Sequence, residues 1–234
     1  MATFLPNRQA MVTKVGKEKG DPWTLHLGTP SVPASGAGTR VKAGTLVVIT
    51  DGPILRSNLT WWKCRVGGQN GWIAETGIVP LLLANETLYV DYSSDGFTLR
   101  AQPDKNSAAV ALLPAGTPVR AVAMNEPSFS YDYAFWRVST ANNLQGWIAT
   151  EGLRLAFPAN ATVAPVPDGS ALRLIRSQPD LQAAPLRSAT PGETFRITAG
   201  PIANDKKGWW KVRARDNAEG WMEEGDLKQV TAQG

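Results

Sequence analysis

The sequence predicts an all-β protein built from three small, similar antiparallel barrels. Three observations lead to this prediction: a motif that occurs three times at near-equal spacing, short strand-like segments between turn residues, and a scarcity of helix-forming runs. The chain has 234 residues, of which 22 are glycine and 17 are proline. This length suits two or three small domains, and the repeat favours three.

A Gly-Trp-apolar motif closes each repeat. Its tryptophans, Trp72, Trp147 and Trp221, are 75 and 74 residues apart. Upstream of the motif, each repeat has a strand that ends in proline, a turn glycine followed by a β-like run, and a pair of adjacent aromatic residues. The aromatic pairs are Trp61-Trp62, Phe135-Trp136 and Trp209-Trp210. Because the landmarks recur in one order, they indicate repeated domains rather than chance similarity.

Short segments of alternating polarity, separated by Gly, Asn, Asp and Pro, predict the strands of these barrels. We assign residues 1–22 to an N-terminal extension and residues 23–83 to the first repeat. Residues 84–157 contain a linker strand and the second repeat, and residues 158–234 contain a linker and the third repeat. The apolar stretch at 79–92 is expected to pack between repeats as an added strand. The three barrels would then form a fixed unit, each closed by its own tryptophans.

The repeat resembles the bacterial SH3 (SH3b) domain. The residues that carry the resemblance are the proline-ended strand, the Gly-Trp-Trp-Lys-Val segment at 208–212, and Gly220-Trp221 with Leu227. The resemblance is clearest in the third repeat and extends over most of the chain. It implies three tandem SH3-like, five-stranded antiparallel barrels. It also implies cell-wall binding as a function.

Strand alternation divides each aromatic pair into an inner and an outer residue, because successive side chains point to opposite faces. The second aromatic shares its face with Cys64, Val138 or Val212, which are typical core residues. The residues predicted to be structural are Trp62, Cys64, Trp72, Trp136, Val138, Trp147, Trp210, Val212 and Trp221. The first aromatic shares the other face with a lysine or arginine. Trp61, Phe135 and Trp209 are therefore candidates either for a ligand platform or for a seal over the barrel.

The segment at 125–135, NEPSFSYDYAF, is a second candidate for recognition. Phe129, Tyr131, Tyr133 and Phe135 recur at every second residue, and the matching loops of the other repeats have no aromatic residues. Aromatic loops on rigid barrels offer a large contact area at a low entropic cost. The same residues could instead cover a neighbouring repeat, and the sequence leaves both alternatives open.

The sequence predicts no catalytic residue, no cofactor and no metal site. His26 is the single histidine and Cys64 the single cysteine, so they cannot found a zinc site or a Cys-His dyad. Cys64 aligns with two valines and is expected to be a small buried apolar residue. The glutamates that follow the repeated tryptophan change register between the copies, which argues against a shared acid–base role. They are Glu75, Glu151, Glu223 and Glu224.

The N-terminus lacks the apolar core of a secretory signal, and the longest apolar run, at 78–84, is too short to span a bilayer. A cytoplasmic location is therefore expected, or an exported one if a signal has been removed. The net charge is +4, and residues 1–83 contain nine Lys/Arg against four Asp/Glu. Nucleic-acid binding by this basic repeat is a remote alternative, because the charges form no stripe.

These observations lead us to expect a non-catalytic interaction protein: a rigid adaptor, or an accessory subunit of a larger assembly, with a protein partner. The alternative is a cell-wall targeting module whose outer aromatics stack on sugar rings or hold peptide stems. The oligomeric state is left open.

Overall fold

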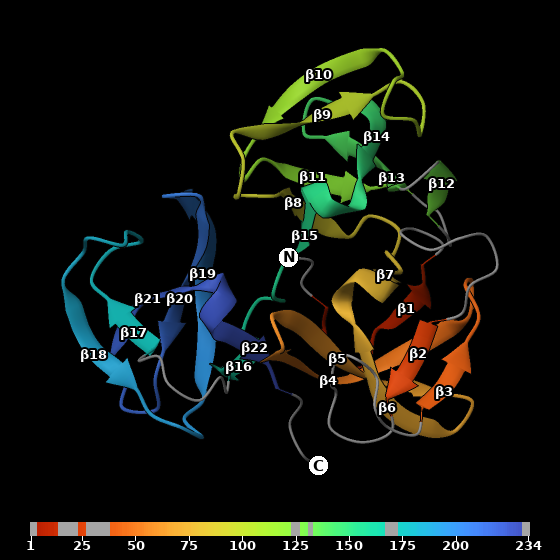
Figure 1. The fold of residues 1–234 in the computed structure, drawn as a ribbon. Coiled ribbons are helices and arrows are strands. Elements are labelled where there is room, and N and C mark those ends of the chain that lie inside the picture. The colour runs from red at the N-terminus through yellow and green to blue at the C-terminus, as the bar shows by residue number, and fades with distance from the viewer. Residues whose placement is uncertain are drawn as a thin grey trace.

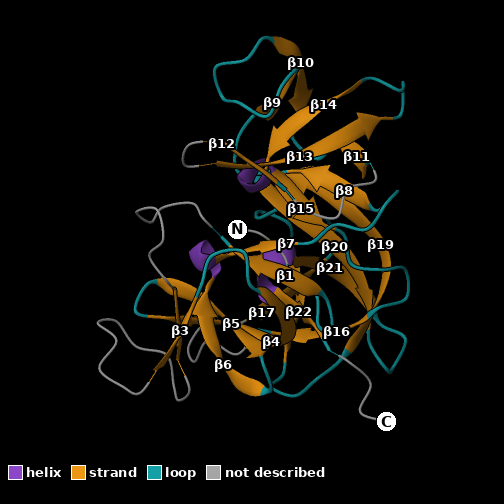
Figure 2. Ribbon diagram, turned by 90° about the vertical axis from the view of Figure 1, so that its right-hand side faces the viewer, coloured by secondary structure: helices purple, strands orange, loops and turns teal. Residues whose placement is uncertain are grey.

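The computed structural model describes residues 4–13, 23–26, 38–122, 127–130, 133–166 and 173–230. Its strands form three antiparallel sheets, which Figure 1 shows as three bodies grouped around the centre of the molecule. The described residues contain three short 3-10 helices and no α-helix. Figure 2 shows that strands and loops make up nearly all of the chain. The predicted all-β class is confirmed.

The first unit is a sheet of seven strands in the order β3-β2-β6-β5-β4-β1-β7. Its elements are β1 (Gln9–Val12), β2 (Trp23–His26), β3 (Gly38–Val41), β4 (Leu46–Arg56), β5 (Leu59–Val66), β6 (Gln69–Ala74), η1 (Glu75–Gly77) and β7 (Ile78–Pro80). Ser57 and Asn58, which join β4 to β5, have φ values of 51° and 57°. Positive φ at both central residues is typical of the two-residue turn that matches the twist of a hairpin.

The second and third units repeat this order, with one additional strand, β12, in the second. The second unit comprises β8 (Thr87–Val90), β9 (Gly96–Arg100), β10 (Ala109–Pro114), β11 (Pro118–Ala121), β12 (Ser128–Ser130), β13 (Tyr133–Thr140), β14 (Gln145–Ala149), η2 (Thr150–Gly152) and β15 (Leu153–Leu155). The third comprises β16 (Thr162–Pro165), β17 (Arg173–Arg176), β18 (Pro185–Ala189), β19 (Phe195–Asn204), β20 (Lys207–Arg213), β21 (Glu219–Glu223), η3 (Glu224–Asp226) and β22 (Leu227–Gln229).

Each sheet includes a strand that the sequence placed in a linker or in the N-terminal extension. These opening strands are β1, β8 and β16, and each pairs with two strands of its own sheet. The expected five strands become seven or eight, because the opening strand and the short strand after each 3-10 helix both join the sheet. The strand predicted within residues 79–92 is β8, which belongs to the second sheet.

Within the described ranges, the interior consists of two main hydrophobic clusters. One fills the first unit and includes Trp62 and Cys64. The other extends without a break from the second unit to the third, and includes both Trp136 and Trp210. Phe157 connects the two parts, because its ring packs edge-on against Trp210 with 5.2 Å between the centroids. The expectation of a separate core in each barrel is therefore correct for the first unit and wrong for the other two.

The three units also contact one another at their edges. Met11 of the first unit packs with Ala134 of the second, and the ammonium group of Lys228 lies 3.0 Å from the carboxylate of Asp51, which joins the third unit to the first. The ring of Tyr92, from the second unit, lies against the backbone of Gly208 in the third. These contacts support the expected fixed arrangement.

Replacement of Gly208 by alanine should weaken the contact between the second and third units. The added Cβ would lie 2.3 Å from Cε2 of Tyr92, and overpacking of this kind costs about 1–3 kcal/mol. Urea unfolding followed by circular dichroism should show a lower midpoint. Gly225→Ala is the control, because the atom nearest to its added Cβ is a carboxylate oxygen of Glu223 at 3.3 Å. Equal losses in the two variants would contradict the tight contact.

Candidate functional site

The three aromatics predicted to face outward are buried. Trp61 is 2% exposed, Phe135 2% and Trp209 1%. The indole N–H groups of the two tryptophans donate to backbone carbonyls at the ends of their hairpins, to Arg56 at 3.1 Å and to Asn204 at 3.2 Å. The expectation of an open ligand platform is wrong, because the hairpin ends pack against these rings. The alternative, a seal over the barrel, agrees with the structure.

The tryptophans of the repeated Gly-Trp-apolar motif are only partly buried, although they were predicted to belong to the interior. Trp72, Trp147 and Trp221 each lie between two buried residues on the strand. Because side chains alternate along a strand, the tryptophans point away from the core. The sequence carried a signal for this arrangement: the residue after each tryptophan is always a large aliphatic or methionine, and it takes the core position. The other predicted structural residues, among them Trp62, Trp136 and Trp210, are buried.

Each of these partly exposed tryptophans lies between basic or imidazole-bearing residues on the two neighbouring strands. We call these three sets the tryptophan rows: His26-Trp72-Lys63, Arg100-Trp147-Arg137 and Arg176-Trp221-Lys211. Residues directly opposite each other in antiparallel pairs have Cβ atoms about 4.5–5.5 Å apart. Each unit therefore presents one indole with at least one lysine or arginine beside it.

Some of the basic residues in the rows also hold nearby loops. Arg100 donates to the carbonyl of Ser107 at 2.8 Å, and Arg176 donates to the carbonyl of Ala183 at 2.7 Å. Lys211 forms an ion pair with Glu219 at 2.7 Å. The geometry of the second and third rows is therefore held by contacts outside the rows.

The aromatic segment at 125–135 packs in part against the first unit. Phe129, in β12, lies against the cluster of Met11, Val79 and Ala134. The ammonium group of Lys105 lies 5.2 Å from the ring centroid of Tyr133. Tyr131 lies outside the described residues. Of the two alternatives left open by the sequence, the structure supports the covering of a neighbouring repeat by Phe129.

Two of the glutamates after the repeated motif have equivalent structural positions. Glu75 accepts a hydrogen bond from the indole N–H of Trp62 at 3.1 Å, and Glu224 accepts one from Trp210 at 3.0 Å. Thr150 stands at this position in the second unit, where the indole nitrogen of Trp136 has no hydrogen-bond partner among the described residues. The expectation that all these glutamates change register is therefore wrong for Glu75 and Glu224.

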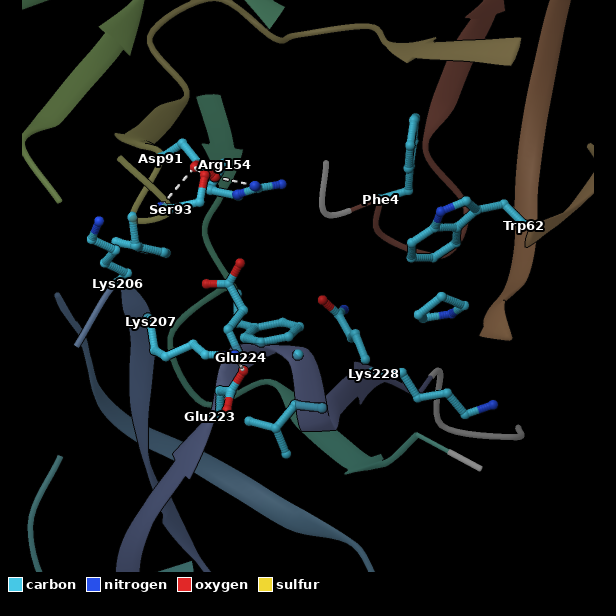
Figure 3. Close-up of a pocket in the computed structure, with 17 residues that line it drawn as sticks. Phe4, Trp62, Asp91, Ser93, Arg154, Lys206, Lys207, Glu223, Glu224 and Lys228 are labelled. Atoms are coloured by element: carbon cyan, nitrogen blue, oxygen red, sulfur yellow. Dashed lines mark hydrogen bonds and ion pairs between the residues drawn. The ribbon is translucent and has the colours of Figure 1, made fainter. Parts of the chain in front are cut away.

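A cavity of about 240 Å³ lies where the three units meet (Figure 3). Its apolar wall includes Phe4 and Trp62 of the first unit, whose ring centroids are 5.1 Å apart, and Phe157, which follows β15 of the second unit. Its polar wall comes from the second and third units and contains both acidic and basic residues. Sequence reasoning missed this site, because its residues are single contributions from segments far apart in the chain.

A buried ion pair forms part of the polar wall. Asp91 is 1% and Arg154 6% exposed, and Nη2 of Arg154 contacts Oδ2 of Asp91. The backbone N–H of Ser93 donates to Oδ1 of Asp91 at 2.8 Å. Burial would raise the pKa of Asp91, but the charge of Arg154 and the hydrogen bonds from Ser93 outweigh it and hold this pKa below its ordinary value. Asp91 is therefore ionised, and its carboxylate contacts one edge of the Arg154 guanidinium.

Apart from Oδ2 of Asp91, which is in the ion pair with Arg154, three residues that line the cavity carry a buried polar atom with no hydrogen-bond partner in the part of the chain that the structure describes. These atoms are Nη1 of Arg154, the hydroxyl oxygen of Tyr92 and Oε1 of Gln229. Burial and the negative charge of Glu224 raise the pKa of Tyr92, so its hydroxyl remains protonated and able to donate. A buried polar atom left unpaired costs about 1–3 kcal/mol, so such groups are rare in folded proteins.

The remaining reactive groups act in packing. Burial raises the pKa of the Cys64 thiol to about 12, which keeps it protonated. His26 packs edge-on against Trp61 with 4.9 Å between the ring centroids, and burial lowers its pKa. Over the described ranges, no three His, Cys, Asp or Glu side chains come together in a way that could hold a metal ion. No helix in the described part of the chain is long and apolar enough to cross a membrane.

A family model of the bacterial SH3 domain matches residues 172–228, which run through the third unit from β17 into β22. The third unit is thus similar to a bacterial SH3 domain, and the first two units share its strand order. The match covers less than half of the chain. No curated protein matches the chain.

Several solved structures align with nearly the whole chain at low similarity. A protein described as an autolysin from Listeria monocytogenes is 11% identical, with 95% of this chain and 96% of that chain covered and a TM-score of 0.29. NlpC2 from Trichomonas vaginalis is 10% identical, with 98% and 100% covered and a TM-score of 0.24. NlpC1 from the same organism is 10% identical, with 98% and 94% covered and a TM-score of 0.24. Similarity at this level carries no argument about fold or function.

Proposed function

We propose that this protein is a non-catalytic binding protein that attaches to the peptidoglycan of the bacterial cell wall. The observation that carries the proposal is the match of residues 172–228 to the bacterial SH3 domain, a family whose resemblance implies cell-wall binding. The strand order of that unit recurs in the other two. The proposal places the protein outside the cytoplasm, in contrast with the location expected from the N-terminal sequence.

The tryptophan rows are the surface that suits this ligand. A partly exposed indole can stack on the apolar face of a sugar ring, and the flanking basic groups can bind carboxylates of the attached peptides. The rows occur once in each unit. Three weak sites on one rigid chain can give an avidity about 10²–10⁴ times the affinity of a single site, provided that the polymer reaches them together.

The adaptor or accessory-subunit function expected from the sequence has less support. It rests on the repeats and the fixed arrangement alone, and neither the fold nor the comparisons point to a protein partner. It becomes the function to examine if the cell-wall test fails.

Co-sedimentation with purified, insoluble peptidoglycan tests the proposal. The chain should pellet with peptidoglycan at physiological ionic strength and should remain in solution with chitin or cellulose at the same mass. Soluble peptidoglycan fragments should release it. Failure to pellet, or equal pelleting with all three polymers, would refute cell-wall binding.

The tryptophan rows can be tested in the same experiment. The triple variant Trp72→Ala/Trp147→Ala/Trp221→Ala should lose at least tenfold in retention, because avidity multiplies the loss at each site, whereas each single variant should lose less. Leu55→Ala and Leu83→Ala are the controls, since these exposed apolar side chains lie outside the rows. Circular dichroism verifies folding. Full retention by the folded triple variant would remove the rows from the proposal and leave the binding itself intact.

A further inference from the structure

We propose that the cavity between the three units binds a small zwitterionic ligand, of the size of an amino acid or dipeptide, with one carboxylate and one ammonium group. This site is separate from the tryptophan rows: Trp72, Trp147 and Trp221 are not among its lining residues. The proposal therefore does not rest on cell-wall binding.

The cavity offers buried donors for a carboxylate. Arg154 and Tyr92 are 6% and 5% exposed, and both Nη1 of Arg154 and the hydroxyl of Tyr92 lack a partner among the described residues. Asp91 already holds Nη2 of the same guanidinium, which fixes its orientation. Hydrogen bonds from a guanidinium to a carboxylate are among the stronger ones in proteins. Because Asp91 offsets the charge of Arg154, hydrogen bonding rather than net charge would select the ligand.

The same cavity offers acceptors for an ammonium group. Oε1 of Gln229 is buried without a partner in the described ranges. Glu223, which is paired with Lys207 at 2.7 Å, and Glu224, which accepts from Trp210 at 3.0 Å, also line the space. Figure 3 shows Glu224 pointing toward Asp91 and Arg154. An ammonium group is a donor only, so it matches a wall of carboxylate and amide oxygens. An inorganic anion would use the donors and leave these acceptors unmatched.

The size and polarity of the cavity limit the class of possible ligands further. A volume of about 240 Å³ is below the range of about 300–1,000 Å³ that is usual for drug-sized ligands. Phe4, Trp62 and Phe157 form the apolar wall, so the ligand should carry a small apolar side chain or backbone. Because all three units line the cavity, a bound ligand would stabilise their arrangement in proportion to its saturation.

Isothermal titration calorimetry and thermal unfolding of the full chain test this inference. The probes are alanine and dialanine, each in the L and D series. The controls are N-acetyl-dialanine, which lacks the ammonium group, and dialanine amide, which lacks the carboxylate. At least one zwitterionic probe should bind and raise the unfolding midpoint, and each blocked analogue should bind at least tenfold more weakly. Dissociation constants weaker than about 1 mM for every probe, or equal affinity for the blocked analogues, would overturn the proposal.

A single-atom variant links the binding to the cavity. Tyr92→Phe removes the unpartnered hydroxyl and keeps the ring, so the free protein should unfold at the same or a higher midpoint. The affinity for the probe should fall about tenfold, as expected for one hydrogen bond to a charged group. Tyr89→Phe is the matched control, because Tyr89 is in β8 but does not line the cavity. Unchanged affinity in Tyr92→Phe would overturn the site.

The two proposals can fail separately. Tyr92→Phe should pellet with peptidoglycan as the unaltered chain does, since its tryptophan rows are intact. A chain that binds dialanine but not peptidoglycan would support the cavity and refute the proposed function. The opposite result would refute the cavity alone.

Discussion

Replacing Trp210 with alanine should lower the free energy of unfolding by about 3–5 kcal/mol and should loosen the second unit together with the third. Trp210 is buried, donates to Glu224 and packs edge-on against Phe157. Its cluster continues into the second unit as far as Trp136, so the cavity left by the indole would lie in a shared interior. Urea unfolding gives the total loss, and hydrogen exchange shows which amides lose protection.

Trp62→Ala provides the matched comparison. Trp62 occupies the same place in the first unit and donates to Glu75 in the same way, but its cluster is confined to that unit. The loss of exchange protection should therefore concentrate in the first unit. If Trp210→Ala left the amides of the second unit fully protected, the second and third units would not unfold cooperatively, although they share one hydrophobic cluster.

Replacing Arg154 with methionine should cost about 3–5 kcal/mol, because it would leave the carboxylate of Asp91 buried without its charge partner. The double variant Asp91→Asn/Arg154→Met removes both charges and keeps an acceptor for the N–H of Ser93. It should recover most of the lost stability, since the desolvation of both ions disappears as well. Urea unfolding at pH 7 measures both. A double variant as unstable as the single one would show that Arg154 acts through packing instead of charge.

The same pair sets a pH dependence with a defined sign. The pKa of Asp91 is lower in the folded protein than its ordinary value, which is about 3.9 in the unfolded chain. Its stabilising contribution is therefore complete well above that value and is lost as the pH falls through the lower, folded-state pKa. Unfolding midpoints between neutral pH and the acid range should fall more steeply below about pH 4 for the unaltered chain than for the double variant. Parallel curves would contradict the charged state of Asp91.

The features that could be predicted from the sequence are those that recur in it. Three copies of the Gly-Trp-apolar motif predicted three β units, and the alignment of Cys64 with two valines correctly placed Trp62, Trp136 and Trp210 inside. Alternation also placed Trp61 on the opposite face. It could not show that this face is covered, because the covering groups, such as the carbonyl of Arg56 and the ring of His26, come from other parts of the hairpin and sheet.

Neither the tryptophan rows nor the cavity could be predicted from the sequence, for related reasons. Trp221 was predicted to be structural because a domain this small depends on a few large side chains, but the following Met222 takes the buried position. The cavity depends on Tyr92, Arg154 and Gln229, which lie on separate strands or loops and form no local pattern. The opening strands β1 and β16, which were not predicted, have only four residues each, too few to show a periodicity that distinguishes a strand from a linker.

These opening strands determine the limits of a segment that could fold as a separate unit. β16 lies outside residues 172–228, yet it fills the gap between β19 and β22. A graft cut at the narrower limits would expose two unpaired strand edges, which invite association with other chains. A segment that is duplicated in a gene or transferred by protein engineering must therefore begin before Thr162. It then includes β16, the strand that joins β19 to β22.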